Sequence, residues 1–395
     1  LPMALRPNTW TSFLVKRRCV TLSLASLLPK LTWKICSELA VGKETGLTKR
    51  CLVVGASSFI GAYVVDALLD AGYDVVGTGR NPRFAEHYRG LGVEYVPFDL
   101  DDPAGLGNLP TDIDYIVHLA GRLPANSVFD LATEDDAADY IRTNTLGTAF
   151  LLEWARKNDV RRIISTTSYA DVQKSWSSTD PVREDWQRNF KMSGDHAAYV
   201  ISKNASADLL FYYNEQYGMK NCVFRLPPVY GCGPHGSLRV NGAVKKSGIG
   251  LFVDKAKAGE PITVFGDADG AVRDIVYVKD VAQAFVRAGA SEGAMGLYNI
   301  GSGRAVSLRE QAEAIASVFS DPEQISEVRV DESKSNGIQP YSFDINRAVR
   351  DFGYAPRFVG FRDLMADWKA EEERGVMPAL FCGVTQEPGR GGGVA

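Results

Sequence analysis

The segment Tyr199-Val-Ile-Ser-Lys203 places a phenol and an ammonium group four residues apart. On a helix, positions i and i+4 lie on one face, so we expect Lys203 close to Tyr199. A phenol titrates near about 10, and a neighbouring cation favours the phenolate, which predicts a proton acceptor that works at neutral pH. With 16 tyrosines in the chain, about one such match arises by chance, so the surroundings of the pair must decide.

A run of hydroxyl side chains, Ser165-Thr-Thr-Ser168, lies upstream at the end of a predicted strand. Ser168 can orient a substrate oxygen through a hydrogen bond, and Thr167 is expected to contact the substrate. The alternative is structural, since Ser and Thr often cap strand ends and turns. If Tyr199 were only structural, the base would have to be sought at Asp171 or His196.

A glycine-rich turn, Gly55-Ala-Ser-Ser-Phe-Ile-Gly61, joins a predicted strand to a predicted helix. The first glycine permits the tight turn, and Gly61 lets the helix pack closely on the strand. The helix N-terminus offers N–H groups to a pyrophosphate. The middle glycine of the fingerprint is replaced by Ser58, and an ordinary glycine-rich turn is the alternative. The setting predicts dinucleotide binding by Gly55, Ser57, Ser58, Phe59, Ile60 and Gly61.

The end of the second predicted strand bears on the choice of cofactor. An acidic side chain there binds the adenosine ribose of NAD, whereas an arginine accommodates the 2′-phosphate of NADP. The sequence has Arg80 and no carboxylate, which favours NADP over NAD, because a guanidinium pairs well with phosphate. A solvated surface charge is the alternative for Arg80. The other residues expected against the cofactor are Asp99, Leu100, Leu119, Ala120, Gly121, Tyr199 and Lys203.

Strands that alternate with helices must position these residues. The predicted strands are 51–55, 74–78, 93–98, 115–119, 162–166 and 221–226, and the predicted helices between them are 60–71, 137–157 and 196–217. This alternation predicts an α/β fold, a doubly wound parallel (Rossmann) sheet with helices on both faces. All the candidate cofactor segments follow carboxyl ends of strands, where such sheets bind ligands.

The regular alternation of strands and helices ends after residue 226, which predicts a smaller C-terminal substrate-binding lobe at 227–370. We expect a long loop up to 250, strands at 262–265 and 274–278, and helices at 281–290 and 308–319. The Rossmann domain spans 49–226, and the chain is expected to return to it around 274–281. Residues 371–395 are expected to form a tail, disordered in its Gly-rich part from 383.

Residues 1–48 differ from the rest, and they are expected to be a leader or a disordered extension. Up to Ser37 there are six Lys or Arg and no acidic residue, and an apolar run follows Lys16-Arg17-Arg18. This pattern is typical of a signal or transit peptide, but an added leader or a mis-assigned gene start is favoured. The apolar run is too short to span a bilayer.

The composition excludes several classes of protein. The 395 residues are 45% hydrophobic and 23% charged, as in ordinary globular proteins, and the net charge is −4. Nothing in this balance indicates a nucleic-acid or membrane partner. The six cysteines form no CxxC pair, so neither a disulfide framework nor a metal site is expected. A reducing, cytoplasmic location fits best.

Taken together, the motifs resemble those of the extended short-chain dehydrogenase/reductase family, also called NAD-dependent epimerases/dehydratases, and in particular of its members similar to UDP-glucose 4-epimerase. The resemblance runs from Lys49 to about Trp368. The segments that carry it are the Gly55–Gly61 turn, His118–Gly121, Asn144–Thr148, Thr167-Ser168, Tyr199…Lys203, Arg225…Gly231, Gly266–Asp274, Val278–Val281, Tyr298–Ser302 and Phe352–Pro356. The resemblance implies a nucleotide-sugar substrate, hydride transfer at a sugar carbon and a homodimer formed through a four-helix bundle.

The resemblance also assigns roles to single residues. Tyr199 takes the hydroxyl proton, Lys203 holds the nicotinamide ribose, and Asn144 steadies the helix that carries the site. Arg273 matches the position of the family's diphosphate-binding arginine, with a salt bridge to Asp274 or Asp280 as the alternative.

Departures from the family pattern narrow the expected reaction. Dehydratases and decarboxylases of the family carry an acid one or two places after the catalytic Ser or Thr, where this chain has Tyr169 and Ala170. Pro228 replaces an Asn that usually lies beside the diphosphate. An epimerase or a dehydrogenase/reductase is therefore favoured over a nucleotide-sugar dehydratase. A non-catalytic NADP-binding sensor or scaffold is the remaining alternative.

Overall fold

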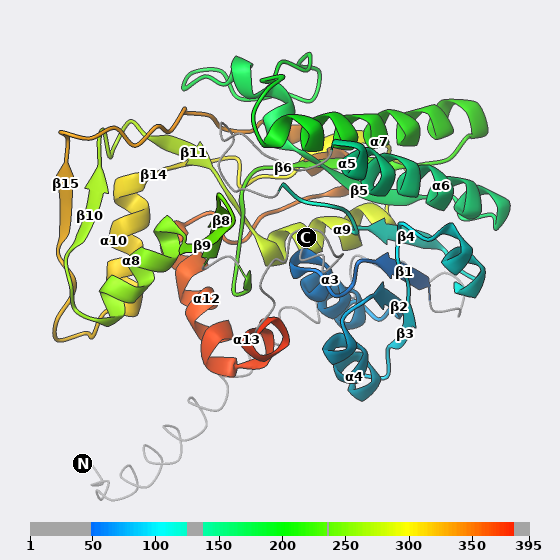
Figure 1. Cartoon of the computed structure of the whole chain (residues 1–395), viewed down its shortest axis with the longest axis horizontal. Helices are drawn as coiled ribbons and strands as arrows, with labels where there is room; N and C mark the ends of the chain where they lie inside the picture. The colour runs from blue at the N-terminus through cyan, green and yellow to red at the C-terminus, as the bar shows by residue number, and fades with distance from the viewer. Residues whose placement is uncertain (1–48, 125–136, 235–236, 383–395) are drawn as a thin grey trace, which may run out of the picture. The chain divides into compact units, whose positions relative to one another are not determined.

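The computed structural model describes residues 49–124, 137–234 and 237–382 (Figure 1). The leader or extension expected at 1–48 and the Gly-rich end of the chain at 383–395 lie outside the described residues. Across the three described ranges, no helix is both long and apolar enough to cross a membrane.

Seven parallel strands form the central sheet, in the order β13-β6-β5-β4-β1-β2-β3. They are β1 (Arg50–Val54), β2 (Asp74–Gly79), β3 (Glu94–Pro97), β4 (Tyr115–His118), β5 (Ile163–Ser168), β6 (Cys222–Leu226) and β13 (Gly296–Asn299). The chain builds outward from β1 to β3 and then crosses back to β4, so the winding reverses between β1 and β4. The doubly wound Rossmann sheet expected from the sequence is confirmed.

Helices cover both faces of this sheet (Figure 1). On one face lie α3 (Phe59–Asp70), α4 (Pro82–Gly90) and α9 (Val278–Ala290); on the other lie α5 (Ala137–Tyr140), the π-helix η2 (Ile141–Leu146), α6 (Gly147–Lys157) and α7 (His196–Tyr217). Within β1, Val53 packs toward the first group, while Leu52 and Val54 pack toward the second. Successive side chains of a strand point to opposite faces, which is why these strands are apolar throughout.

The segment 137–157 differs from the single long helix that we expected. It is helical throughout, but η2 widens it into a π-helix at Ile141–Leu146. The backbone oxygen of Asn144 accepts hydrogen bonds from the hydroxyls of Thr148, at 2.5 Å, and Ser206, at 2.7 Å. Side chains that compete for a helical carbonyl disturb the regular i→i−4 ladder, and π-bulges of this kind are frequent at functional sites.

The C-terminal lobe contains small sheets and helices. They are β7 (Val229–Tyr230), β8 (Ser237–Val240), β9 (Ala243–Lys246), α8 (Gly248–Lys257), β10 (Ile262–Phe265), β11 (Val272–Asp274), β12 (Val276–Tyr277), β14 (Ala305–Ser307), α10 (Leu308–Phe319), β15 (Val328–Asp331), α11 (Asn346–Phe352), α12 (Phe361–Arg374) and α13 (Val376–Phe381). The prediction of a long loop up to residue 250 is wrong in part. Strand β7, the β8–β9 hairpin and the start of α8 lie within that stretch.

The chain returns to the Rossmann sheet over a wider stretch than the expected 274–281. The strand expected at 274–278 is divided into β11, which pairs with β14, and β12, which pairs with β7. Helix α9 then packs against α3, and β13 joins the edge of the main sheet beside β6.

The tail boundary expected at residue 371 is also wrong. Helix α12 continues to Arg374, and α13 follows after Gly375, which has a φ of +77°. Met377, Leu380 and Phe381 of α13 are buried. The order of this segment comes from packing on distant parts of the chain, which a short local pattern does not reveal.

Candidate active site

The glycine-rich turn has the geometry of a phosphate-binding turn. Ser58 caps α3 by accepting from the Gly61 N–H at 3.0 Å, so the first-turn amides of the helix face the carboxyl edge of the sheet. Gly55 has a φ of +94°, and a Cβ there would lie 2.6 Å from the Ala120 nitrogen. A Cβ on Gly61 would lie 2.1 Å from the Gly55 oxygen. Both glycines are therefore required by close backbone packing.

The other expected cofactor segments lie at the same edge. Leu119 and Ala120 donate backbone hydrogen bonds to the Val54 oxygen at 2.8 and 2.9 Å, which holds the end of β4 against the turn. Behind this edge, Leu100 is buried against Gly147, and Gly121 packs against the Asn144 side chain. Ser57 is buried beside Gly79, the residue before Arg80.

Arg80 forms an ion pair, whereas an unpaired guanidinium would best suit the 2′-phosphate of NADP. Its guanidinium lies 3.0 Å from a carboxylate oxygen of Asp99, and both side chains are partly exposed. The two residues follow different strands, β2 and β3, so the pair is formed by the sheet and not by the local sequence.

Lys203 lies on α7 with its ammonium group buried beside β5. Its Nζ contacts Thr166 Oγ1 at a long 3.4 Å, and no carboxylate pairs with it in the described ranges. Burial lowers the pKa of Lys203 to about 8. An ammonium group has three donors, so this one can hold two further acceptors.

Asn144 ties the neighbouring elements to α7. Its side-chain oxygen accepts from the Arg122 N–H at 2.7 Å, and its amide donates to the Arg122 carbonyl and to Ser202 Oγ at 2.9 Å. Ser202 precedes Lys203, so the network links the chain after β4 with the catalytic helix. The expected steadying role of Asn144 has this geometric basis.

His118 forms a second buried contact near Lys203. Its Nε2 lies 3.0 Å from Thr148 Oγ1, and its Nδ1 is buried without a protein partner. Burial, followed by the charge of Lys203, lowers the pKa of His118 to about 3, so the imidazole is neutral at physiological pH.

Tyr199 lies one helical turn before Lys203, as its spacing requires. Burial and the nearby Tyr169 phenol raise the pKa of Tyr199 to about 12. This direction is opposite to the lowered pKa expected from the sequence, because burial disfavours the charged phenolate. The His196 ring packs edge-on against Tyr199, with ring centroids 6.5 Å apart.

The two candidate substrate hydroxyls end β5. Ser168 Oγ accepts from the Ala170 N–H at 3.2 Å, which begins the short helix η3 (Tyr169–Ser175) and leaves its own proton available to an acceptor. Thr167 is buried, and its Oγ1 has no protein partner. A buried polar atom without a partner is costly unless a ligand or water satisfies it.

Arg273, on β11, has none of the salt bridges offered as its alternative explanation. Asp274 instead accepts from Ser302, Gly303 and Phe343, and Asp280 accepts from Arg357 and Phe358. The guanidinium of Arg273 donates to the Tyr230 hydroxyl at 3.0 Å, and its Nε is buried without a partner.

Asp171 is engaged in a buried ion pair. Its carboxylate forms a buried ion pair with Arg225 at 3.0 Å, and the two side chains are 3% and 1% exposed. Burial raises the pKa of Asp171, against the opposing effect of Arg225. The pair anchors η3 to β6, so freeing this acid would require breaking a buried ion pair.

An aromatic cluster beside Ser168 was not expected from the sequence. Tyr169 stacks on Trp176 with centroids 5.3 Å apart, and Trp176 stacks on Tyr341 at 4.4 Å. Tyr341 is a backbone neighbour of Arg273. Tyr341 is far from the other two residues in sequence, and only the position of Tyr169 directly after Ser168 could have drawn attention to the cluster.

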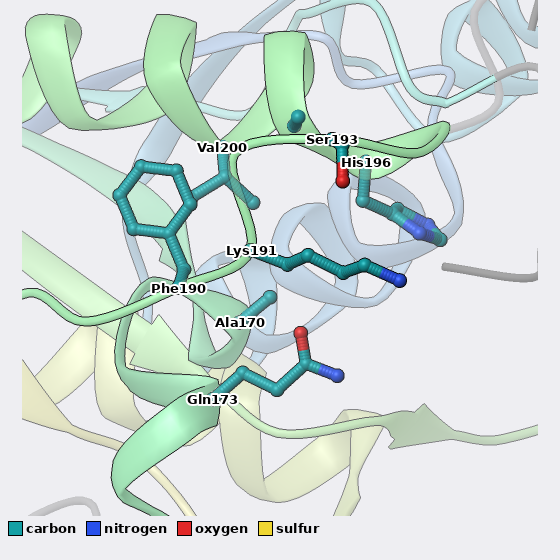
Figure 2. Close-up of a pocket in the computed structure, with 8 residues that line it drawn as sticks. Ala170, Gln173, Phe190, Lys191, Ser193, His196 and Val200 are labelled. Atoms are coloured by element: carbon teal, nitrogen blue, oxygen red, sulfur yellow. The ribbon is translucent and has the colours of Figure 1, made fainter. Parts of the chain in front are cut away.

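A small open hollow lies between η3 and the start of α7 (Figure 2). It is lined by Ala170, Gln173, Phe190, Lys191, Ser193, His196, Ala197 and Val200. In Figure 2 the side chains of Gln173, Lys191 and His196 extend toward the same side. His196 and Val200 flank Tyr199 on α7, so the hollow borders the catalytic segment.

Fold and site together define the class: a Rossmann-fold enzyme with a Ser, Tyr and Lys set at the carboxyl edge of the sheet. The chain belongs to the NAD dependent epimerase/dehydratase family, whose model matches residues 51–301. It is accordingly an NAD(P)-dependent epimerase or dehydrogenase/reductase of the extended short-chain dehydrogenase type.

Relatives and solved structures agree with this membership. The chain is 32% identical over 285 residues to a UDP-glucose 4-epimerase of Mycolicibacterium smegmatis, covering 70% of this chain and 84% of that protein. It is 28% identical over 247 residues to UDP-glucuronic acid decarboxylase 1 of Danio rerio, covering 60% and 53%.

Among solved structures, the UDP-glucose 4-epimerase of Thermotoga maritima with UDP-glucose superposes with a TM-score of 0.64 at 22% identity, over 82% of this chain and 99% of that one. The UDP-glucose 4-epimerase of Thermus thermophilus in complex with NAD gives 0.61 at 24%, over 83% and 99%. Likeness at this identity supports the fold.

Proposed function

We propose that this protein is a nucleotide-sugar epimerase that oxidises and re-reduces one sugar carbon with a bound NAD. The observation that carries the proposal is the Lys203 ammonium, which is buried beside Tyr199 at the Rossmann carboxyl edge without a carboxylate partner in the described ranges. A buried cation with spare donors suits the hydroxyls of a ribose.

The residues present fit a dinucleotide. Gly55 and Gly61 allow the close turn under the first amides of α3, and Lys203 would hold the nicotinamide ribose. When bound, the dinucleotide supplies the acceptor and donor of the hydride.

Within this site, Tyr199 exchanges the proton of the sugar hydroxyl, and Ser168 donates its hydroxyl proton to the same oxygen. The Tyr199 pKa of about 12 means that the phenol is protonated at neutral pH before substrate and cofactor bind. A positive charge brought close to the phenol lowers that pKa, and Lys203 contributes one from the next turn of α7.

Arg273 supports a diphosphate-linked substrate. Among the described residues no carboxylate pairs with its guanidinium and no partner satisfies its buried Nε, while Tyr230 accepts a hydrogen bond from it. Charge-assisted bonds to phosphate are strong and directional. Anchoring at the diphosphate leaves the sugar ring held less tightly, so a keto sugar can turn and present its other face to hydride return.

The surroundings of Ser168 favour epimerisation over elimination. Tyr169 and Ala170 provide no carboxyl group after Ser168, and Asp171 is held by Arg225. Removal of water needs a general acid at the leaving group, and these residues supply none. The decarboxylase and epimerase relatives share the family, but this feature supports the epimerase.

The Arg80–Asp99 pair shifts the expected cofactor from NADP to NAD. The sequence favoured NADP on Arg80 alone, but Asp99 neutralises the guanidinium and adds negative charge where a 2′-phosphate would lie. The NAD named for the Thermus thermophilus structure agrees with this choice. Titration with NADH and NADPH tests it, and tighter binding of NADPH would contradict it.

The helices α6 and α7 support the expected homodimer. They lie side by side, and together with η2 they expose a set of apolar side chains to solvent: Ile141 and Leu146 of η2, Phe150 of α6, and Ile201 and Tyr212 of α7. An exposed apolar surface of this kind marks an interaction site. Two such helices from each of two copies would form the four-helix bundle that the family resemblance implies.

The decisive experiment is conversion of nucleotide sugars. The protein is incubated with NAD and, separately, UDP-glucose, UDP-galactose, UDP-N-acetylglucosamine and UDP-glucuronate, and products are identified by NMR. We expect interconversion of one 4-epimeric pair, with Arg273→Ala raising the KM by about 10-fold or more, because a charge-assisted phosphate contact is lost. Arg304→Ala, a surface ion-pair residue, is the control. Release of a dehydrated or decarboxylated product, or no turnover of any of these sugars, would contradict the proposal.

A further inference from the structure

The helix α13 lies outside the part of the chain that defines the family. The family model ends at residue 301, whereas α13 spans Val376–Phe381. Its side chains Met377, Leu380 and Phe381 are 3%, 7% and 7% exposed. A six-residue helix is not stable alone, so this burial must hold it in place.

Phe381 packs between two aromatic rings of the Rossmann domain. Its ring centroid is 5.4 Å from that of Phe84 and 6.5 Å from that of Phe59, both in tilted or edge-on geometry. Beside it, Arg83 donates to the carbonyl of Cys382. Figure 1 shows α13 next to α3 and α4.

Both rings belong to segments that form the dinucleotide site. Phe59 is the first residue of α3, in the glycine-rich turn, and Phe84 lies in the first turn of α4, four residues after Arg80. The amides near Phe59 face the pyrophosphate position, and Arg80 marks the adenosine ribose. Phe381 therefore bridges the two walls of the adenosine half of the site.

Several neighbours besides Phe381 also confine the Phe59 ring. On its other side lies the loop after β7, where a Cβ on Gly231 would come within 3.0 Å of the ring and one on Gly233 within 2.5 Å. Tyr63 also packs edge-on against it at 5.8 Å. Removing Phe381 takes away one of the contacts that confine the Phe59 ring.

Helix α12 fixes α13 to the rest of the chain. Glu371, which is buried, pairs with Lys279 of α9 at 2.5 Å and with Arg374 at 2.8 Å, and Glu372 pairs with Lys257 of α8 at 2.8 Å. Because these anchors come from both the Rossmann domain and the C-terminal lobe, α13 cannot shift freely.

We infer that Phe381 is a positioning residue of the dinucleotide site, which holds Phe59 and Phe84 so that the glycine-rich turn and the start of α4 keep their binding geometry. The inference rests on the proposed binding of NAD. A site whose supporting residues are loosened binds more weakly even when every contacting group is present.

The test compares NADH binding, by fluorescence titration, to the full-length protein and to Phe381→Ala and Phe381→Leu. We expect the Kd to rise by about 3- to 10-fold for Phe381→Ala, the effect of losing favourable aromatic pairs, and less for Phe381→Leu. The KM for NAD should rise while kcat at saturating NAD is unchanged. Hydrogen exchange of the segment 57–63 should accelerate.

Phe352→Ala is the matched control, because Phe352 is a buried aromatic residue of the C-terminal part that packs on Phe224 and Tyr298, away from the turn. It should lower the melting temperature without changing the NADH Kd. An unchanged NADH Kd for Phe381→Ala would overturn this inference and leave the proposed function intact. Wild-type protein that binds neither NADH nor NADPH would overturn the proposed function. If Phe381→Ala does not fold, Phe381→Leu decides by the same criteria.

Discussion

At the scale of single residues, Lys203 and Tyr199 titrate away from their usual values for the same reason. Burial disfavours the charged form of each, so the lysine pKa falls to about 8 and the tyrosine pKa rises to about 12. At neutral pH the Tyr199 phenol therefore keeps its proton and the Lys203 amine is mostly charged. Each group can be tested separately.

Replacing Tyr199 by Phe removes one oxygen and leaves the ring. Without its proton acceptor, hydride transfer would leave a protonated carbonyl, so kcat should fall by about 10²–10⁴-fold. NADH affinity should stay within a few-fold of wild type. This distinguishes the variant from Lys203→Met, in which kcat and NADH affinity should both fall. Stopped-flow absorbance of the bound nicotinamide measures the hydride step. Wild-type rates in Tyr199→Phe would make Tyr199 structural and direct attention to His196.

The Lys203 pKa predicts a pH dependence of cofactor binding. The ammonium is present below pH 8 and is lost above it, so NADH affinity should decline as pH rises through about 8. The stability effect has the opposite sign. Between about 8 and the usual 10.5 the unfolded chain holds the proton that the folded chain has lost, so this group makes folding more favourable as pH rises. Kd measured from pH 6 to 10 checks the decline; Lys203→Arg, which stays charged, should flatten it.

At the scale of elements, the buried pair of Asp171 with Arg225 fixes η3 against β6. This contact ties the chain directly after Ser168 to β6, and it occupies the Asp171 carboxylate. The π-helix η2 acts in a comparable way on the other side, since Asn144 connects it to α7. Both contacts thus hold the elements that carry the candidate residues Ser168 and Lys203.

Arg225→Met should destabilise the protein by about 3–5 kcal/mol at neutral pH, because it leaves the Asp171 carboxylate buried without its partner. Burial already raises the Asp171 pKa, so the variant should lose less stability at pH 5, where that carboxyl can bind a proton. Urea unfolding at pH 5 and 7 measures the difference. The double variant with Asp171→Leu should recover part of the loss; equal losses at both pH values would argue against an uncompensated charge.

At the scale of the whole molecule, the exposed apolar side chains of η2, α6 and α7 form the surface through which we expect two copies to associate. Phe150 and Leu146 are 38% and 46% exposed, and Ile201 adds a third apolar group on α7. Charged residues are disfavoured in the core of an interface, so a single acidic substitution there should be sufficient to disrupt it.

Phe150→Glu should convert a dimer into a monomer, measured by size-exclusion chromatography with light scattering. Val349→Glu on α11 is the control, since Val349 is similarly exposed, at 43%, but lies outside this surface. It should leave the dimer intact. A wild-type monomer, or a Phe150→Glu protein that remains dimeric, would show that this surface is not the interface.

The sequence by itself determined the features that depend on neighbouring residues. Helix 196–217 and strand 262–265 were predicted with their observed bounds, and the Gly55–Gly61 turn has the expected strand and helix on either side. These features follow from periodicity, capping and glycine conformation, which act over a few residues.

Only the tertiary structure decided the features that join distant residues. The carboxylate that pairs with Arg80 is 19 residues away, and the partner of Asp171 is 54 residues away. The same holds for the absence of a carboxylate beside Arg273 in the described chain, and for the docking of α13, which the sequence placed in a tail. Burial and pairing of charges depend on which segments the sheet brings together, and no local pattern encodes that neighbourhood.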